Sequence, residues 1–567
     1  MNASLILKNA VIYTMDSAGT KASALAACGD KILYVGDEDG ALAYADENTN
    51  IMDLQGKMVA PGFLNGHDHL SSYEQMKRNM LLLDDTSEPH SLELYSRMIQ
   101  NYIDDHPHLE YVYAMGMDLQ VFPDNLAENT WLNENFPDIP VAVTDVSGHG
   151  LLINQKTMDL AGITDDSPIP EGGTAYRYED GSLTGYFSDA RTIVGDVVPD
   201  MFAILKKQLE PGNEEGRKNY LEAYEEFQAL ANSYGMTGLD DGGEGNLRTW
   251  EFFDEYSKTG KMSMRLCLPY TTQDGPILPQ VDGIIAAVTE GKAKYESDFQ
   301  HINQVKNIID GVPEGKSTLM LEPYPVEAGM GENYYGPQYS TQEEMNEFAQ
   351  KIDAAGYQVL VHSMGDGGCH VCTEAYTHAM DVNGSKDPRH VIVHASLMAD
   401  ADIKKCGEYG IYAAVQPIWF YIDPQFSALE KAAIGEERFY REYRMRDMME
   451  AGMTMTGGAD YAVTPDFSPL SGIQCGVTQG SPYPGEKGKE EYIRNKNQTV
   501  SVYEMLKVYT INCAKQMRME DIIGSLEPGK KADMVVLEKD ITEIDPLDIA
   551  ETKVCYTFFD GRIVHEG

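Results

Sequence analysis

The sequence lacks any long apolar segment, since no run of about 18 hydrophobic residues interrupts its polar stretches. Its first residues, from Met1 to Lys8, carry neither a basic start nor an extended apolar core. We therefore expect neither a transmembrane helix nor a secretory signal peptide.

Cysteine is also sparse, with 8 residues scattered through a chain of 567. This usage favours free thiols in a reducing compartment, and we expect a cytoplasmic protein. The one close pair is Cys369 and Cys372, which would suit a redox pair or half of a metal site. Because no second C-x-x-C pair exists to complete a zinc knuckle, two free thiols are the favoured interpretation.

Basic residues are too few to balance the acidic ones. The chain has 44 Lys and Arg against 90 Asp and Glu, which gives a net charge of −46. A surface of this charge repels nucleic-acid phosphates and anionic lipid headgroups. We therefore expect a small-molecule substrate, no nucleic-acid partner and no membrane partner. A homodimer is expected from base rates alone.

The chain does have enough apolar material for a large core, because 42% of its residues are hydrophobic. Both ends of the chain contain short apolar runs that are typical of β-strands, at residues 5–7, 10–13, 31–36, 534–537, 555–559 and 562–564. These runs predict a small β-sandwich domain formed from both chain termini. We assign residues 1–60 and 516–567 to it, and residues 61–515 to the domain between them.

The middle of the chain alternates short apolar runs with amphipathic segments. The runs lie at residues 111–116, 141–144, 237–239, 359–361, 391–393, 412–415 and 453–457, and residues 219–234 and 341–355 are typical of helices. Buried strands that alternate with helices indicate parallel β/α units. We predict the α/β class and a (β/α)8 TIM-type barrel. Residues 165–196, 323–339, 420–444 and 476–496 are predicted to be loops that shape a substrate pocket.

The candidate chemistry begins at His67 and His69, which follow an apolar run and a Pro-Gly pair. Residues i and i+2 of a strand point to the same side, so both imidazoles can chelate one ion, usually zinc. His362, His394 and Asp460 also follow apolar runs, at the strand ends where barrels carry catalytic residues. Each of these three alone is equally explained by a buried, hydrogen-bonded histidine or a helix-capping aspartate.

With Lys306, which lies on an alternating apolar segment, these residues form a pattern that resembles the amidohydrolase superfamily. The metal ligands of that superfamily are H-x-H on the first strand, lysine on the fourth, histidines on the fifth and sixth, and aspartate on the eighth. Residues 60–69 look like its P-G-F-x-x-x-H-x-H start, and residues 524–537 look like its G-x-L-x-x-G-K-x-A-D-x-V-V-L end. Several shorter segments are similar to the branch that includes N-substituted formamide deformylase. That branch often has Glu near Asp189 and Ser near Gly458, and this chain departs from it there.

The resemblance implies a metal-dependent hydrolase of a C–N bond in an amide, an N-substituted formamide or a cyclic amide. The implied metal ligands are His67, His69, Lys306, His362, His394 and Asp460. The first two histidines and the aspartate would hold one divalent ion, for which zinc is expected. The other two histidines would hold a second ion, with a CO2-derived carbamate on the lysine as the bridge. If Lys306 is unmodified, the site holds one ion and one of these histidines orients the substrate; a solvated or ion-paired lysine is the alternative.

The resemblance also implies that Asp460 takes a proton from the attacking water and passes it to the leaving nitrogen. His149 is the candidate for a second group that polarises the substrate, and a loop histidine is the alternative. Asp68 is expected to support the ligands structurally. Asp118 and Asp366 are expected to orient ligand histidines or to be turn carboxylates.

The function itself has alternatives at this stage. A deaminase, lyase or decarboxylase on the same scaffold fits the ligand pattern, and so does a protein that binds metal without catalysis. Aromatic side chains in or beside the predicted loops favour an apolar substrate, unless they only pack: Tyr324, Tyr334, Tyr335, Trp419 and Phe420.

Overall fold

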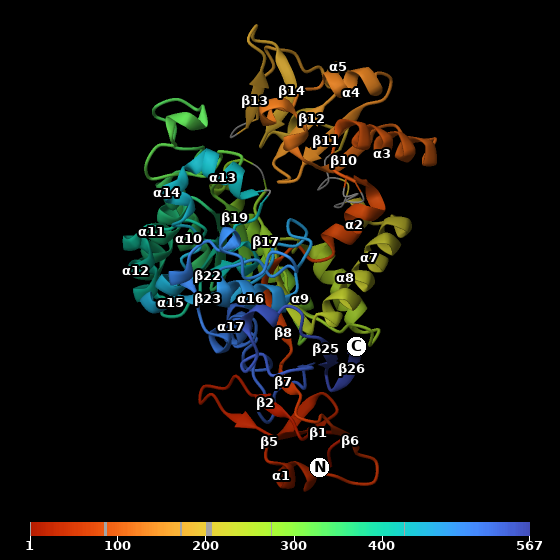
Figure 1. Ribbon diagram of the computed structural model, residues 1–567, viewed down its shortest axis with the longest axis vertical. Helices are drawn as coiled ribbons and strands as arrows, with labels where there is room; N and C mark the ends of the chain where they lie inside the picture. The colour runs from red at the N-terminus through yellow and green to blue at the C-terminus, as the bar shows by residue number, and fades with distance from the viewer. Residues whose placement is uncertain are drawn as a thin grey trace.

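The computed structural model describes residues 2–83, 88–170, 173–199, 204, 207–273, 275–424 and 426–567. Three units lie along its long axis, with sheets from both chain ends at one end, a β/α unit in the middle and an inserted sheet at the other end (Figure 1). In these ranges, no helix is long and apolar enough to cross a membrane. All eight cysteines are free, as the sequence predicts, and Cys369 and Cys372 are buried.

The two chain ends are joined in one sheet, whose order is β26-β25-β24-β7-β2-β3. In it, β24 from the C-terminal part pairs antiparallel with β7 from the N-terminal part. A second sheet, β5-β4-β1-β6, shares a hydrophobic cluster with the first, to which Leu7, Ile12 and Met534 all belong. The contribution of both termini agrees with the prediction, whereas the sandwich and its boundaries stay predictions. The elements are β1 (Leu5–Lys8), β2 (Val11–Tyr13), β3 (Lys21–Ala22), β4 (Ala24–Cys28), β5 (Lys31–Gly36), α1 (Glu38–Leu42), β6 (Asn50–Asp53), β7 (Met58–Pro61), β24 (Met534–Leu537), β25 (Val554–Phe559) and β26 (Arg562–Glu566).

The middle unit contains parallel strands in two hydrogen-bonded arcs, β8-β15-β16-β18 and β17-β19-β20-β21-β22-β23. Between the arcs, the ladder of the described residues is open, so the closed barrel that we predict is not formed as one continuous sheet. The arcs nevertheless meet at their carboxyl ends, where the amide of Asp460 donates to the carbonyl of His67 at 3.1 Å. The strands are β8 (Phe63–Asp68), β15 (Met236–Asp241), β16 (Arg265–Cys267), β17 (Tyr270–Thr271), β18 (Gln300–His301), β19 (Gln304–Ile308), β20 (Gln358–Ser363), β21 (Val391–His394), β22 (Tyr412–Val415) and β23 (Thr454–Gly457).

Helices follow most of these strands and bury one apolar face each. A typical case is α10, where Thr341 caps the N-terminus in a reciprocal capping box with Glu344, and Phe348 and Ile352 on its inner face are fully buried. The helices are α2 (Ser72–Asn79), α7 (Glu214–Ser233), α8 (Leu247–Ser257), α9 (Val281–Tyr295), α10 (Gln342–Ala354), α11 (Asp366–Asn383), α12 (Asp400–Tyr409), α13 (Phe426–Ile434), α14 (Glu436–Phe439), α15 (Met445–Ala451), α16 (Pro469–Thr478), α17 (Val502–Val508) and α18 (Ile511–Gln516).

The inserted sheet corrects the sequence prediction. The apolar runs at residues 111–116 and 141–144 are not barrel strands but belong to a separate mixed sheet of order β13-β14-β12-β11-β10-β9. Helices α3 and α4 pack on one face, where Leu94 and Trp131 join the cluster of Val112. The elements are β9 (Leu81–Leu82), α3 (Leu92–Asp105), β10 (Val112–Met117), α4 (Thr130–Asn135), β11 (Val141–Asp145), β12 (Gly150–Ile153), α5 (Gln155–Ala161), β13 (Thr174–Arg177) and β14 (Leu183–Ser188).

The four segments predicted to be loops differ in structure. Residues 165–196 contain β13 and β14, with positions 171–172 outside the described residues, and residues 420–444 contain α13 and α14, with position 425 outside them. Residues 323–339 and 476–496 contain short 3-10 turns and little other regular structure. Two of the aromatic side chains, Tyr324 and Phe420, are buried in hydrophobic clusters, so they pack.

Candidate metal centre

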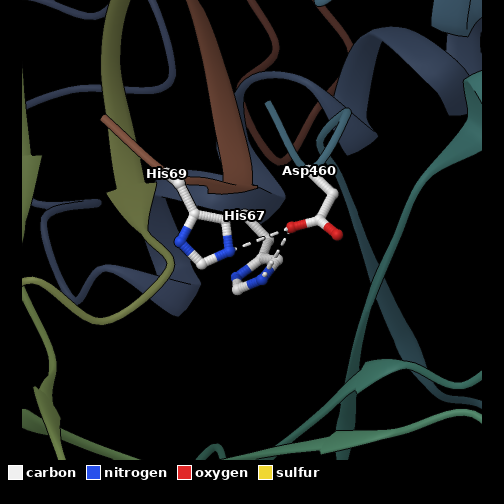
Figure 2. Close-up of side chains that lie close together, drawn as sticks. All are labelled: His67, His69 and Asp460. Atoms are coloured by element: carbon white, nitrogen blue, oxygen red, sulfur yellow. Dashed lines mark ion pairs between the residues drawn. The ribbon is translucent and has the colours of Figure 1, made fainter. Parts of the chain in front are cut away.

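His67, His69 and Asp460 point at one another at the carboxyl end of β8 (Figure 2). One carboxylate oxygen of Asp460, Oδ1, lies 3.4 Å from Nε2 of His67 and 3.2 Å from Nε2 of His69. The alternating geometry of a strand brings the two imidazoles to the same side, as the H-x-H spacing predicts.

Backbone hydrogen bonds hold the loop after β23 against the end of β8. The amide of His69 donates to the carbonyl of Tyr461 at 2.5 Å, and the carboxylate of Asp68 accepts the amides of Ala459 and Tyr461 at 2.9 and 3.1 Å. Asp460 has a φ of +57°, a left-handed conformation that residues other than glycine rarely adopt. The support that we predict for Asp68 is thus a clamp on the two neighbours of Asp460.

Two glycines allow this close approach. A Cβ atom on Gly458 would lie 2.3 Å from the carbonyl oxygen of His67, and one on Gly242 would lie 2.4 Å from the ring of His69. Gly458 is one of the two positions where the sequence departs from the branch that it resembles, since that branch often has Ser nearby. In this structure any side chain at Gly458 would push the backbone of His67 away.

Lys306 reaches the same point from the middle of β19, as the ligand pattern predicts. Its Nζ lies 3.3 Å from Nε2 of His67, and its side chain is buried. Burial lowers the pKa of Lys306 to about 8, although the nearby charges of Asp460, Asp241 and Asp240 act in the opposite direction. The amine is therefore far easier to deprotonate than an ordinary lysine.

His394 and His362 extend the cluster from β21 and β20. The ring centroids of His67 and His394 are 5.4 Å apart, and those of His362 and His394 are 4.5 Å apart. Nδ1 of His394 lies 2.8 Å from Oε1 of Gln416, which fixes the tautomer with Nε2 as the free lone pair. The ring of Trp419 stacks on the ring of His394, with the centroids 5.6 Å apart, so Trp419 lies beside the site.

These side chains fit a divalent cation. Burial lowers the pKa of His67 and of His394 to about 3 and that of His362 well below its usual value, so these imidazoles are neutral as ligation requires. His69 differs, because burial lowers its pKa but the neighbouring carboxylate of Asp460 outweighs burial and raises it. Oδ1 of Asp460 is buried and has no hydrogen bond of good geometry among the described residues, so it is available to bind a cation.

A second group with metal-ligand chemistry, His370, Glu374 and Asp402, lies on the outer helices α11 and α12. There the ammonium of Lys405 already lies 2.7 Å from the carboxylate of Glu374. His370 is 43% exposed, so this group lacks the desolvated setting of His67. We therefore favour the first group as the metal centre.

His149 comes from the inserted sheet, between β11 and β12. Its Nδ1 lies 2.6 Å from Oδ1 of Asp189. Its charge, after burial and the charges of His394 and Lys306, contributes to the lowered pKa of His362. The structure thus holds His149 against Asp189, with its charge within range of His362.

Two predicted orienting residues lie elsewhere. Asp118 caps a 3-10 turn by accepting the amide of Gln120 at 2.9 Å and pairs with His90 in the inserted unit. Asp366 starts α11 and accepts the amide of Leu321 at 2.8 Å. Both are turn carboxylates, which is the alternative interpretation.

Sequence reasoning missed the buried acids Asp240 and Asp241 at the end of β15. Each has one oxygen without a hydrogen-bond partner among the described residues, and burial raises the pKa of Asp240 to about 7. The rule that found His362, a polar residue directly after an apolar run, would have found them, because they follow the run at residues 237–239.

Comparison with known proteins identifies the family of the chain. Residues 50–565 match a family described as the amidohydrolase family. The protein LONG AFTER FAR-RED 3 of Arabidopsis thaliana is 26% identical over 99% of this chain and 91% of its own length. N-substituted formamide deformylase of Arthrobacter pascens is 23% identical over 99% of this chain and 98% of its own length.

Solved structures give the same result at the level of the fold. An uncharacterized metal-dependent hydrolase from Pyrococcus horikoshii OT3 superposes with a TM-score of 0.70 at 22% identity, covering 96% of this chain and 99% of that one. At this identity the likeness shows the fold, and the chemistry has to be argued from the site.

Proposed function

The chain belongs to the amidohydrolase family, and from this premise we propose that it is a metal-dependent hydrolase of a C–N bond. The substrate bond is that of an amide, an N-substituted formamide or a cyclic amide. The observation that carries the proposal is the convergence of His67, His69 and Asp460 on one point, with the buried Lys306 beside it. The comparison with N-substituted formamide deformylase supports the choice of bond.

His67, His69 and Asp460 would hold one divalent ion, with zinc as the expected metal. His362 and His394 would hold a second one if Lys306 is carboxylated by CO2, and the site has a single ion if it is not. A divalent ion held here lowers the pKa of a bound water to about 7 and polarises the scissile carbonyl. The buried setting excludes bulk water and so strengthens the electrostatic interactions of these side chains.

Asp460 is the proton carrier of this proposal. Burial would raise its pKa, but the neighbouring imidazoles of His67 and His69 lower it well below the usual value, so the carboxylate is ionised and can accept a proton. Asp460 takes the proton of the attacking water and returns it to the leaving nitrogen. His149 donates a hydrogen bond to the substrate oxygen on which negative charge develops.

Other properties follow from the sequence and stay proposals. The eight free thiols support a reducing, cytoplasmic compartment. The substrate is a small molecule, and a homodimer is the expected assembly. The division at residues 1–60, 61–515 and 516–567 needs one addition, because the inserted sheet forms a unit within the middle part.

The test is a screen of N-formyl and N-acyl amines with purified protein, zinc and ¹⁸O-labelled water. Hydrolysis puts one ¹⁸O into the released acid, which mass spectrometry detects. Release of CO2 without ¹⁸O in an acid product would indicate a decarboxylase, and ammonia release from an amino-substituted ring would indicate a deaminase. Metal binding without turnover of any of these substrates would contradict the proposal.

A further inference from the structure

The inserted sheet presents a histidine–aspartate pair whose geometry follows from its strand register. In the antiparallel pair of β12 and β14, Gly150 lies opposite Ser188. One residue beyond this pair, His149 therefore lies opposite Asp189. The amide of Asp189 donates to the carbonyl of His149 at 2.9 Å, and Nδ1 of His149 lies 2.6 Å from Oδ1 of Asp189. Backbone and side chains thus hold the same two residues together.

The loop that carries His149 is fixed before any substrate binds. The carboxylate of Asp145 accepts the amide and hydroxyl of Ser147 at 3.1 and 2.6 Å and the amide of Gly150 at 3.3 Å. It also accepts the hydroxyl of Tyr186, on β14, at 2.7 Å. One buried carboxylate therefore ties both ends of the turn to the neighbouring strand, which preorganises the imidazole.

Leu151 and Phe187 lie two positions from His149 and Asp189 and belong to one hydrophobic cluster. Ala462, two residues after Asp460, packs against the same cluster. His149 acts by its charge on the pKa of Asp310, which burial raises to about 7, and also on that of His362. Asp189 contributes, after burial, to the raised pKa of Tyr334 in the segment that follows β19. The pair therefore lies on the part of the inserted sheet that meets the loop of Asp460.

We propose that Asp189 is the positioning residue of His149 and that the inserted sheet thereby completes the active site. The carboxylate accepts the proton of Nδ1 and so leaves Nε2 as the ring nitrogen that addresses the substrate oxygen. An anionic partner at Nδ1 also favours the form of the ring that donates from Nε2, which suits an oxygen gaining negative charge. This inference rests on the proposed hydrolysis.

Kinetics of four variants test the coupling of the two residues. Asp189→Asn keeps an acceptor of the same shape but removes its charge, and we expect kcat to fall about 10- to 100-fold with little change in KM. Asp189→Ala and His149→Ala should each reduce kcat, and the double variant should be no worse than His149→Ala alone. Asp180→Asn, in the exposed turn before β14, is the matched control and should keep wild-type kinetics.

Two kinetic results would overturn the inference. One is a wild-type kcat in Asp189→Asn, and the other is a double variant in which the two losses multiply, because the residues would then act independently. A merely structural Asp189 would lower stability in proportion to activity, so thermal unfolding of each variant is measured beside its kcat.

A second arm needs no activity and no metal. With ¹⁵N-labelled histidine, a short Nδ1–H bond to a carboxylate gives a far-downfield proton resonance, which Asp189→Ala and His149→Ala should both remove and Asp180→Asn should keep. Its absence in the native protein would contradict the pair. If the resonance is present but no amide is hydrolysed, the pair stands and the proposed function fails, so the two failures are distinguishable.

Discussion

The carboxylate of Asp68 positions Asp460 through the backbone, because its Oδ1 accepts the amides of Ala459 and Tyr461 on either side of that residue. The second oxygen of Asp68 accepts the side-chain amide of Asn65. Asp68 thus lies between His67 and His69 in the sequence, but its hydrogen bonds hold the backbone on both sides of Asp460.

Asp68→Asn tests this clamp. An amide side chain offers one acceptor where the carboxylate has two, and its NH2 group would face a donor, so a buried hydrogen bond is lost. We expect the protein to lose about 1–3 kcal/mol of stability in denaturant unfolding and metal affinity to fall about 10- to 100-fold. Asp366→Asn, which alters a turn carboxylate away from the ligands, should change neither. Unchanged metal affinity in Asp68→Asn would contradict the clamp.

Asp460→Asn tests the proton carrier. The variant keeps the size of the side chain and the backbone contacts of its neighbours, so it should fold normally by circular dichroism. Its turnover should fall by about 10² to 10⁴, because an amide cannot accept the proton of the attacking water. Asp466→Asn, on the same loop, is the control, since that carboxylate accepts the amide of Ser468 and bonds to Tyr483. Near-normal turnover of Asp460→Asn would remove it from the mechanism.

The two candidate metal groups make opposite predictions in elemental analysis. His67→Ala should lose bound zinc, because it removes a neutral imidazole from the buried centre. His370→Ala should keep it, since that residue belongs to the outer group where Lys405 already neutralises Glu374. Full zinc content in His67→Ala, or loss of zinc in His370→Ala, would contradict the choice of the His67 group as the metal centre and favour the His370 group.

Much of the centre is predictable from the sequence, and particular residues show why. His67 and His69 follow from strand geometry, and the ends of β20 and β21 put His362 and His394 where the apolar runs predict. Each of these predictions uses only the residues next to one another in the chain. The apolar runs of β10 and β11 have the same local pattern, but a local pattern does not determine which sheet a strand joins. The sequence therefore predicts both strands to be in the barrel, although they belong to the inserted sheet.

Contacts between distant segments were beyond the same reasoning. The pairing of His149 with Asp189 depends on the register of β12 and β14, which are separated in the chain by α5 and β13. The acceptor role of Asp68 was expected only as support, because its partners lie in a loop about 390 positions later, at Ala459 and Tyr461. Sequence thus predicted which residues gather and not what holds them in place.

The buried acid Asp240 predicts how stability depends on pH in the metal-free protein. Burial raises its pKa from 3.8 to about 7, although its Oδ2 accepts the side-chain amides of Gln304 and Gln516. The folded state therefore binds a proton more tightly than the unfolded state. The resulting stabilisation is fully present below about pH 4 and is lost as the pH rises through about 7.

Asp240→Asn isolates this contribution, since the amide has no charge to bury. Relative to the native protein, the variant should gain stability at about pH 8 compared with about pH 5.5, as measured by urea midpoints at both values. Asp180→Asn, at an exposed turn, should track the native protein at both pH values. If Asp240→Asn showed the same change in stability with pH as the native protein, another group would be responsible for that pH dependence.

Lys306 decides whether the centre holds one ion or two. A carbamate forms when the neutral amine attacks CO2, making an N–C bond and releasing a proton to solvent, so a pKa of about 8 leaves a large reactive fraction near pH 8. We expect reconstitution with zinc and ¹³C-bicarbonate to raise activity above that of bicarbonate-free protein and to give a carbamate carbon resonance. Lys306→Gln should lose both effects, and Lys316→Gln, which removes a half-buried lysine bonded to a carbonyl, should keep them. Equal activity with and without bicarbonate, together with no carbamate resonance, would assign Lys306 as an unmodified lysine beside a single ion.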